Sequence, residues 1–551
     1  MSIRLLARAA LALSLLLPGA AMSTSPKQSA SVVSAPAGKF RGVSDGAMRV
    51  FKGIPFAEPP VGLLRWRPPV PKARLPGTFD ATSFGPACHQ PSTKMNHIYA
   101  TDPWPMSEDC LSLNIWTPAK AKKAPVFVWI YGGALWSGTS RDPLYDGRRL
   151  AERDMIVVSI NYRTGPLGWL AHPELSKESS DGISGNYGLM DQIAALQWVQ
   201  KNIASFGGDP ANVTIAGESA GALSVMYLMA SPPARGLFHK AIAQSGYLIS
   251  TPALQTAIHG SPPAEQVGAF FAGKLNAPDL ASLRAIPGGE LTEKMFAAGF
   301  PPFGAVDGKY LPGQLVDIFD QGKQAPVPIL AGFNEGEIRS LKILAPPAPD
   351  SAATYESKIR AAYGELADAF LKLYPAEHYP DSILATTRDA LYGWTAERLV
   401  RSQSASGAPS YLYLWDHGYP AADDAGLHAF HAAELPYVFG TYKQTPPLWP
   451  KVPDTAAQRA LSDALTDYWA SFAKTGKPTA DAAPDWPAYA PSQSFMRFAG
   501  TPQVSRDLMP GMFELNEEVM CRRKAVGMTG WNWNVGLAAP PLPAESCKKQ
   551  N

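Results

Sequence analysis

The 551-residue sequence has few charged residues, few histidines and few cysteines. Charged side chains make up 17% of the chain and the formal net charge is +2. Neither a nucleic acid nor an anionic membrane is therefore an expected partner, because both are recognised by concentrated positive charge. The nine histidines and four cysteines form no C-x-x-C or H-E-x-x-H pattern. We therefore expect no zinc site.

The N-terminus is typical of an export signal. Arg4 and Arg8 precede an apolar run at 9–17, and residues 18–21 are the helix-breaking and small residues suited to cleavage near Ala21. A membrane-spanning helix needs roughly 20 apolar residues, which neither this run nor any other segment supplies. We expect a signal at 1–21 that is removed, no membrane association afterwards, and a periplasmic or extracellular protein.

The four cysteines fit an exported protein. They allow three pairings. A bond between Cys88 and Cys110 would close a modest loop and stabilise the fold by about 3 kcal/mol in the chain-entropy picture. Cys521 and Cys547 are the remaining pair, and four free buried thiols are the alternative that the sequence leaves open.

One short motif points to chemistry. The pentapeptide Gly217-Glu218-Ser219-Ala220-Gly221 has the form G-x-S-x-G, entered by a β-prone apolar run at 213–217 and left by a helix-prone run at 220–229. A serine on such a strand–turn–helix is held in a strained turn that exposes its hydroxyl. Chance alone produces the pentapeptide roughly once in three chains of this composition, so its surroundings must decide.

The surroundings predict a doubly wound, mostly parallel sheet. Residues 124–131 and 155–160 are apolar runs typical of buried strands. Residues 186–203 predict an amphipathic helix, with Leu189, Ile193, Leu196 and Ile203 at helical spacing. Strand, helix, strand and helix in alternation indicate one large α/β domain at 22–551 rather than several small ones.

A serine nucleophile needs a base and an acid that orients it, in the chain order serine, acid, histidine for this kind of fold. A predicted strand at 326–332 is followed by Glu335 and Glu337, and another at 410–415 is followed by His428 and His431. Acids at the carboxyl end of a strand are well placed for catalysis. The residues alone do not decide between Glu335 and Glu337 as the acid, nor between His428 and His431 as the base.

Several segments resemble the type-B carboxylesterases, the α/β-hydrolase family that includes the cholinesterases. They are FKGIPFAEPPVG at 51–62, LRWRPP at 64–69, FGPAC at 84–88 and SEDCLSLN at 107–114. The resemblance implies an α/β-hydrolase fold with helical insertions at about 252–326 and 341–400 around a gorge. It also implies that the family's first disulfide falls on Cys88 and Cys110.

The same resemblance selects the catalytic partners. The family pattern G-x-N-x-D-E-G aligns with residues 332–338 and places the acid on Glu337, although Gly336 and Ile338 replace the usual Asp and Gly. The pattern H-x-x-E-L-x-Y-V-F-G at 431–440 makes His431 the base and leaves His428 a neighbour. In the glycine-rich loop 131–138 and after the nucleophile, the implied oxyanion donors are the amides of Gly133, Ala134 and Ala220.

The interpretation is a secreted serine hydrolase that cleaves carboxylic esters through an acyl-enzyme, with no metal or organic cofactor. A lipase acting on long-chain esters is the nearer alternative, and an adhesion protein that keeps the fold is the more distant one. The residues Trp104, Leu135, Trp136 and Trp169 line an apolar cleft or belong to the core. The tail after about residue 520 carries no functional signal that we can identify.

Overall fold

The computed structural model describes residues 29–92, 97–528, 535–544 and 547. The signal expected at 1–21 lies outside them.

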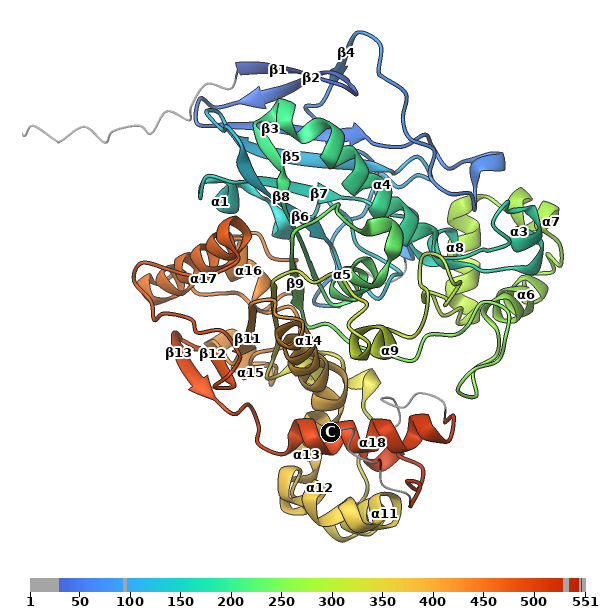
Figure 1. The fold of residues 1–551 in the computed structure, drawn as a ribbon, viewed down its shortest axis with the longest axis vertical. Helices are drawn as coiled ribbons and strands as arrows, with labels where there is room; N and C mark the ends of the chain where they lie inside the picture. The colour runs from blue at the N-terminus through green and yellow to red at the C-terminus, as the bar shows by residue number, and fades with distance from the viewer. Residues whose placement is uncertain (1–28, 93–96, 529–534, 545–546, 548–551) are drawn as a thin grey trace, which may run out of the picture.

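A 13-stranded mixed sheet runs through the molecule, with strand order β1-β2-β3-β5-β7-β6-β8-β9-β10-β11-β12-β13 and β4 beside β2 (Figure 1). Its centre is parallel, as the sequence predicts. The parallel strands are β6 (Ala124–Ile130), β7 (Ile156–Ile160), β8 (Gly208–Glu218), β9 (Lys240–Gln244), β10 (Ile329–Asn334), β11 (Ser410–Trp415) and β12 (Ser494–Ala499).

The edges of the sheet are largely antiparallel, which the sequence did not predict. They consist of β1 (Ser29–Ala35), β2 (Gly38–Ser44), β3 (Met48–Pro55), β4 (Thr78–Asp80), β5 (Ser112–Pro118) and β13 (Thr501–Arg506). Short connections between β1, β2 and β3 and between β12 and β13 make antiparallel pairing the natural outcome, since a parallel neighbour needs a long crossover.

Both faces of the sheet are buried, which is why its central strands are apolar at nearly every position. Along β6, Val126 and Val128 join one hydrophobic core, whereas Phe127 and Trp129 join the other. The first core is covered by α4 (Tyr187–Asn202) and α5 (Ala220–Ala230), and the second by α16 (Leu435–Val438) and α17 (Ala456–Thr475).

The helix α4 differs from its prediction in one respect. It is buried around most of its circumference instead of exposing a polar face. Trp198 packs against Phe40 and Phe206 on one side, and Gly188 lies against the Trp169 ring on another. The N-terminal strands and the segment after β7 thus cover the faces of α4 that would be exposed to water if the helix only packed on the sheet.

Of the two segments expected to be helical insertions, 341–400 is mainly helical, whereas 252–326 alternates helices with irregular stretches. Residues 252–326 contain α6 (Ala264–Lys274), α7 (Leu280–Ala285), α8 (Gly288–Ala298) and α9 (Leu315–Asp320). Residues 341–400 contain α11 (Ala352–Tyr363), α12 (Ala367–Leu373), α13 (Tyr379–Arg388) and the start of α14 (Trp394–Ala405), and α11 to α13 lie with α18 (Met512–Ala525) at one end of the molecule (Figure 1). The remaining helices are short: α1 (Arg148–Ala151), α2 (Gly165–Trp169), α3 (Pro173–Glu178), α10 (Glu337–Ser340) and α15 (Pro420–Asp424).

Two disulfide bonds cross-link the chain, Cys88–Cys110 and Cys521–Cys547. The first is the pair implied by the family resemblance, and the second is the pair that remained. Of the residues described, none belongs to a helix both long and apolar enough to cross a membrane.

Candidate active site

Ser219 occupies the turn between β8 and α5, with a backbone φ of 56° and ψ of −122°. Positive φ is strained for a residue with a side chain. The two glycines of the motif make this turn feasible. A Cβ on Gly217 would lie 2.4 Å from the Gly221 carbonyl carbon, and one on Gly221 would lie 2.1 Å from the Ile130 oxygen. The turn is therefore packed against β6 with no room for a side chain at either position.

The loop after β6 approaches the same turn. A Cβ on Gly132 would lie 2.7 Å from the Glu218 carbonyl oxygen, so the loop backbone lies directly against the turn. Gly133 and Ala134 have φ values of 106° and 54°. Their amides donate no hydrogen bond to any other residue in the described part of the chain. The Ala220 amide is the first of α5, and helix geometry gives it no intrahelical acceptor.

Glu337 is the first residue of α10, directly beyond the end of β10. Its Oε1 accepts a hydrogen bond from the Asn334 amide at 2.8 Å, and its Oε2 is hydrogen-bonded to Nδ1 of His431. Glu335 instead pairs with the Arg388 guanidinium at 2.9 Å. The structure thus brings Glu337, and not Glu335, to the imidazole.

The loop that carries His431 is attached to the loop that carries the acid. The Gly336 amide donates to the Ala429 carbonyl at 2.8 Å, and the Asn334 side chain donates to the Phe430 carbonyl at 2.8 Å. A Cβ on Gly336 would lie 2.7 Å from the Leu427 oxygen. This close approach leaves no room here for the aspartate side chain of the family pattern.

His428 lies outside the site. Its Nδ1 is 2.8 Å from Asp423 and its Nε2 is 3.2 Å from Asp416. The hydrogen bond with Asp416 is the largest cause that raises the His428 pKa to about 9. Glu335, Asp416 and His428 bring ligand atoms within 4.8 Å of one another. Arg388 and Arg497 pair with the two carboxylates, so the charge of this group is already balanced without a cation.

Sequence reasoning missed two buried carboxyl groups, Glu218 and Glu434. Glu218 Oε1 lies 3.0 Å from Nε2 of His431, on the residue that precedes Ser219. Glu434 accepts hydrogen bonds from Asn334 at 2.7 Å and from Gln244 at 2.8 Å. Both lie within motifs described above: Glu218 is the variable residue of G-x-S-x-G, and Glu434 is the glutamate of the pattern at 431–440. A charged residue at a motif position expected to be buried was the signal that could have found them.

The electrostatics of the site follow from this crowding. Burial raises the pKa of Glu218 to about 8 and that of Glu434 to about 7. Burial by itself would lower the His431 pKa, but the charges of Glu218 and Glu337 outweigh it and raise the value to about 9. An imidazole stabilised in its charged form suits a base that must take a proton from serine.

Comparison with known proteins identifies the family of the chain. The sequence profile described as "Carboxylesterase family" matches residues 29–513. The chain belongs to the carboxylesterase family. It has the α/β-hydrolase fold, and it is a carboxylic ester hydrolase.

Relatives of this carboxylesterase are similar over most of their length. Fumonisin B1 esterase of Sphingopyxis macrogoltabida is 36% identical over 88% of each chain. Para-nitrobenzyl esterase of Bacillus subtilis is 37% identical over 83% of this chain and 92% of its own. Among solved structures, a PNB esterase superposes with a TM-score of 0.74 at 32% identity, covering 88% of this chain and 99% of that one.

Aromatic side chains surround the imidazole of the carboxylesterase. The ring of Tyr392 lies 5.4 Å from that of His431, and the ring of Tyr99 lies 6.2 Å away, edge-on. Of the four apolar residues expected either to line a cleft or to belong to the core, three belong to the core and one is exposed. Leu135, Trp136 and Trp169 are buried, whereas Trp104 is 56% exposed.

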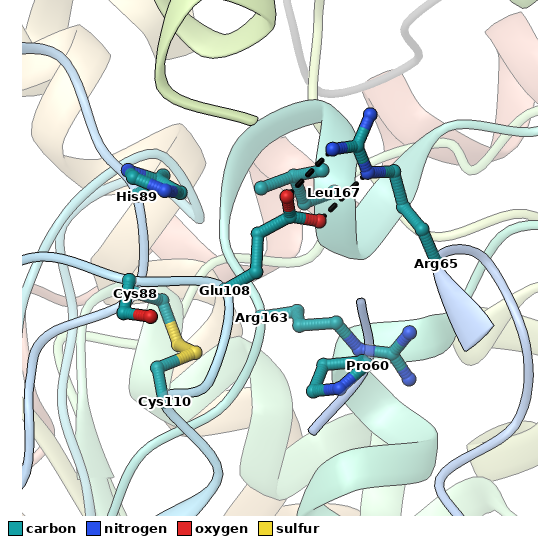
Figure 2. A pocket seen from close by; sticks show the side chains of 9 residues that line it. Pro60, Arg65, Cys88, His89, Glu108, Cys110, Arg163 and Leu167 are labelled. Carbon is teal, nitrogen blue, oxygen red and sulfur yellow. Dashed lines mark hydrogen bonds and ion pairs between the residues drawn. A yellow bond between two sulfur atoms is a disulfide. The ribbon is translucent and has the colours of Figure 1, made fainter. Parts of the chain in front are cut away.

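A small pocket lies apart from these residues, beside the Cys88–Cys110 disulfide (Figure 2). Figure 2 shows the guanidinium of Arg65 paired with the carboxylate of Glu108, both in the lining of the pocket; their shortest separation is 2.6 Å. Arg163, also in its lining, is paired with Asp191 at 2.7 Å. None of the predicted catalytic residues lines the pocket. The Arg65–Glu108 pair holds the Cys110 end of the segment between the two cysteines, whereas both residues of the Arg163–Asp191 pair lie outside that segment.

Proposed function

We propose that the chain is an exported serine carboxylesterase whose nucleophile is Ser219, whose base is His431 and whose orienting acid is Glu337. The observation that carries this proposal is the position of one imidazole, with Nδ1 on Glu337 and Nε2 beside the turn that holds the serine. The carboxylate fixes the tautomer that leaves Nε2 free to accept a proton.

The reaction follows from these positions. Ser219 Oγ attacks the ester carbonyl carbon while its proton passes to Nε2 of His431. The tetrahedral intermediate then collapses, the bond to the alcohol oxygen breaks, and Nε2 returns the proton to the leaving alkoxide. A water molecule attacks the acyl-enzyme with the same base, which releases the acid and restores the serine.

The negative oxygen of the intermediate needs donors that are already oriented. The free amides of the loop after β6 and the first amide of α5 are available as such donors, because the loop lies against the nucleophile turn. We assign the oxyanion hole to the amides of Gly133, Ala134 and Ala220.

Domain organisation and location complete the proposal. A leader at 1–21 is removed, and 22–551 forms one domain with helical insertions at about 252–326 and 341–400. The unbroken family match over 29–513 supports one domain. The two disulfides support an oxidising compartment, the periplasm or the medium.

The test is a comparison of wild type with Ser219→Ala on a panel of esters. The panel spans short and long p-nitrophenyl esters, methyl esters, a p-nitrobenzyl ester and fumonisin B1, the last two because of the relatives' names. Hydrolysis that disappears in a variant with unchanged circular dichroism supports the assignment. A rate jump above the solubility limit of a long-chain ester would favour the lipase alternative, and equal activity of Ser219→Ala would remove Ser219 from the mechanism.

A further inference from the structure

The segment between Cys88 and Cys110 carries a tyrosine to the catalytic imidazole. The hydroxyl of Tyr99 lies 3.0 Å from the carbonyl oxygen of His431, to which it donates. The same hydroxyl oxygen lies 2.7 Å from the Ser340 hydroxyl oxygen. Because a phenol has one proton, it donates to one of these two partners at a time. A single phenol therefore contacts both the residue that bears the base and the helix α10 that begins with the acid.

The contact with α10 leads directly to Glu337. Ser340 is the last residue of that helix, and its hydroxyl donates to the Glu337 carbonyl at 3.4 Å. Tyr99 and the acid are thus joined through one side chain. Loss of the phenol hydroxyl would remove a hydrogen-bonding partner of the Ser340 hydroxyl and of the His431 carbonyl in a half-buried setting, where unmade hydrogen bonds carry a cost.

The ring of Tyr99 adds a second kind of contact. It meets the His431 ring edge-on at 6.2 Å and the Trp449 ring edge-on at 5.8 Å. Trp449 in turn packs on Phe430, the neighbour of His431, at 4.8 Å. Burial keeps the pKa of Tyr99 well above its ordinary value, so the hydroxyl stays protonated and remains a donor.

The segment that carries Tyr99 is fixed at several points. The Cys88–Cys110 bond and the Arg65–Glu108 ion pair hold its base (Figure 2). The Ala87 amide bonds to the Pro105 carbonyl at 3.0 Å, and the Ser107 amide bonds to the Ala87 carbonyl at 2.9 Å. A closed base limits how far Tyr99 can move from its partners.

We propose that Tyr99 is a positioning residue for ester hydrolysis: its phenol holds the His431 loop and α10 together, and the Cys88–Cys110 bond supports turnover through it. The proposal rests on the proposed function of His431 and Glu337. Neither the disulfide nor the tyrosine touches the reacting atoms. Their effect passes through the alignment of the imidazole with the acid, on which rate depends steeply.

The first test is Tyr99→Phe, which keeps the ring and removes the hydroxyl. We expect kcat to fall about 3- to 10-fold, the size of one lost hydrogen bond, with KM changed less than about 2-fold. The matched control is Tyr355→Phe, which removes a buried hydroxyl bonded to the Tyr374 carbonyl at 3.2 Å in α11. The control should retain the wild-type kcat.

Ser340→Ala removes the other partner and leaves the tyrosine intact, so it tests the proposal independently if Tyr99→Phe folds poorly. A lower kcat at unchanged KM supports the proposal. Wild-type kcat in a folded Tyr99→Phe enzyme, or an equal loss in Tyr355→Phe, overturns it. Ser219→Ala, measured beside them, separates the two hypotheses: if that variant is inactive and Tyr99→Phe is unaffected, only the role of Tyr99 fails.

The link to the disulfide is tested by a double-mutant cycle. Cys88→Ser/Cys110→Ser should lower kcat, whereas Cys521→Ser/Cys547→Ser, at the other disulfide, should not. If the bond acts through the phenol, adding Tyr99→Phe to the first pair costs less than it does in wild type. Fully multiplicative losses would show that the disulfide acts independently of Tyr99.

Discussion

Glu218 and Glu337 approach the His431 ring at its two different nitrogens. Glu337 is hydrogen-bonded to Nδ1, and Glu218 Oε1 lies 3.0 Å from Nε2, the nitrogen that the proposed mechanism uses. Two carboxyl groups on one imidazole favour its charged form. The charge of Glu218 therefore has a cost, because an imidazole that is already protonated cannot accept the serine proton.

Glu218→Gln should therefore move the acidic limb of the kcat/KM profile to lower pH. The charge of Glu218 is the largest cause that raises the His431 pKa toward about 9, so its removal lowers that pKa and leaves neutral imidazole at lower pH. Steady-state rates on a soluble p-nitrophenyl ester from about pH 5 to 10 measure the midpoint. A midpoint that stays in place or rises would contradict the assignment.

Glu337→Gln should lower kcat by about 1,000- to 10,000-fold, since an amide at this position no longer selects the productive tautomer or stabilises the imidazolium. Glu335→Gln is the matched control two residues earlier. It loses one ion pair with Arg388 and should keep kcat within a few-fold of wild type. Single-turnover acylation rates distinguish the variants, and the reverse ranking would assign the acid to Glu335.

The sequence predicted well those parts of the fold that depend on local pattern. Strand β11 begins and ends where its apolar run does, and β6 ends one residue early. The motif around Ser219 and the two family patterns are local signals as well. Residues at strand ends in a parallel sheet converge on one edge, so these motifs could be placed together without knowing the strand order.

The buried carboxyl network depends instead on strand order and could not be predicted. Glu434 is held by Gln244, which lies 190 residues earlier at the end of β9. Nothing in either local sequence specifies the other. The all-round burial of α4 was missed for the same physical reason: periodicity shows which residues are apolar, but not which distant segments cover them.

Gly221→Ala should destabilise the protein by about 1–3 kcal/mol, because the new Cβ would lie 2.1 Å from the Ile130 oxygen and backbone must shift. The shift displaces Ser219, so kcat should fall as well. Gly273→Ala in α6 is the matched control: apart from its chain neighbours and the backbone of its own helix, no atom lies within 4 Å of the new Cβ, and alanine favours a helix by about 0.5–1 kcal/mol. Urea unfolding of both variants measures the difference, and equal stability would show that the turn has room.

His428→Gln should destabilise the protein in a manner that depends on pH. In the folded state the hydrogen bonds with Asp416 and Asp423 raise the His428 pKa from 6.5 to about 9. A raised pKa means that the stabilisation is complete below about pH 6.5 and is lost as the pH rises through about 9. The ion pairs Arg497–Asp416 and Arg388–Glu335 beside His428 are present in both proteins.

The difference in free energy of unfolding between wild type and His428→Gln is therefore expected to be largest near pH 6 and to close toward about pH 10. Because His428 is more than one-third exposed, solvent screens its ion pairs and the difference should be modest. Urea titrations at several pH values measure it. A difference that is constant over this range would mean that His428 acts by packing the His431 loop, since packing does not depend on its proton.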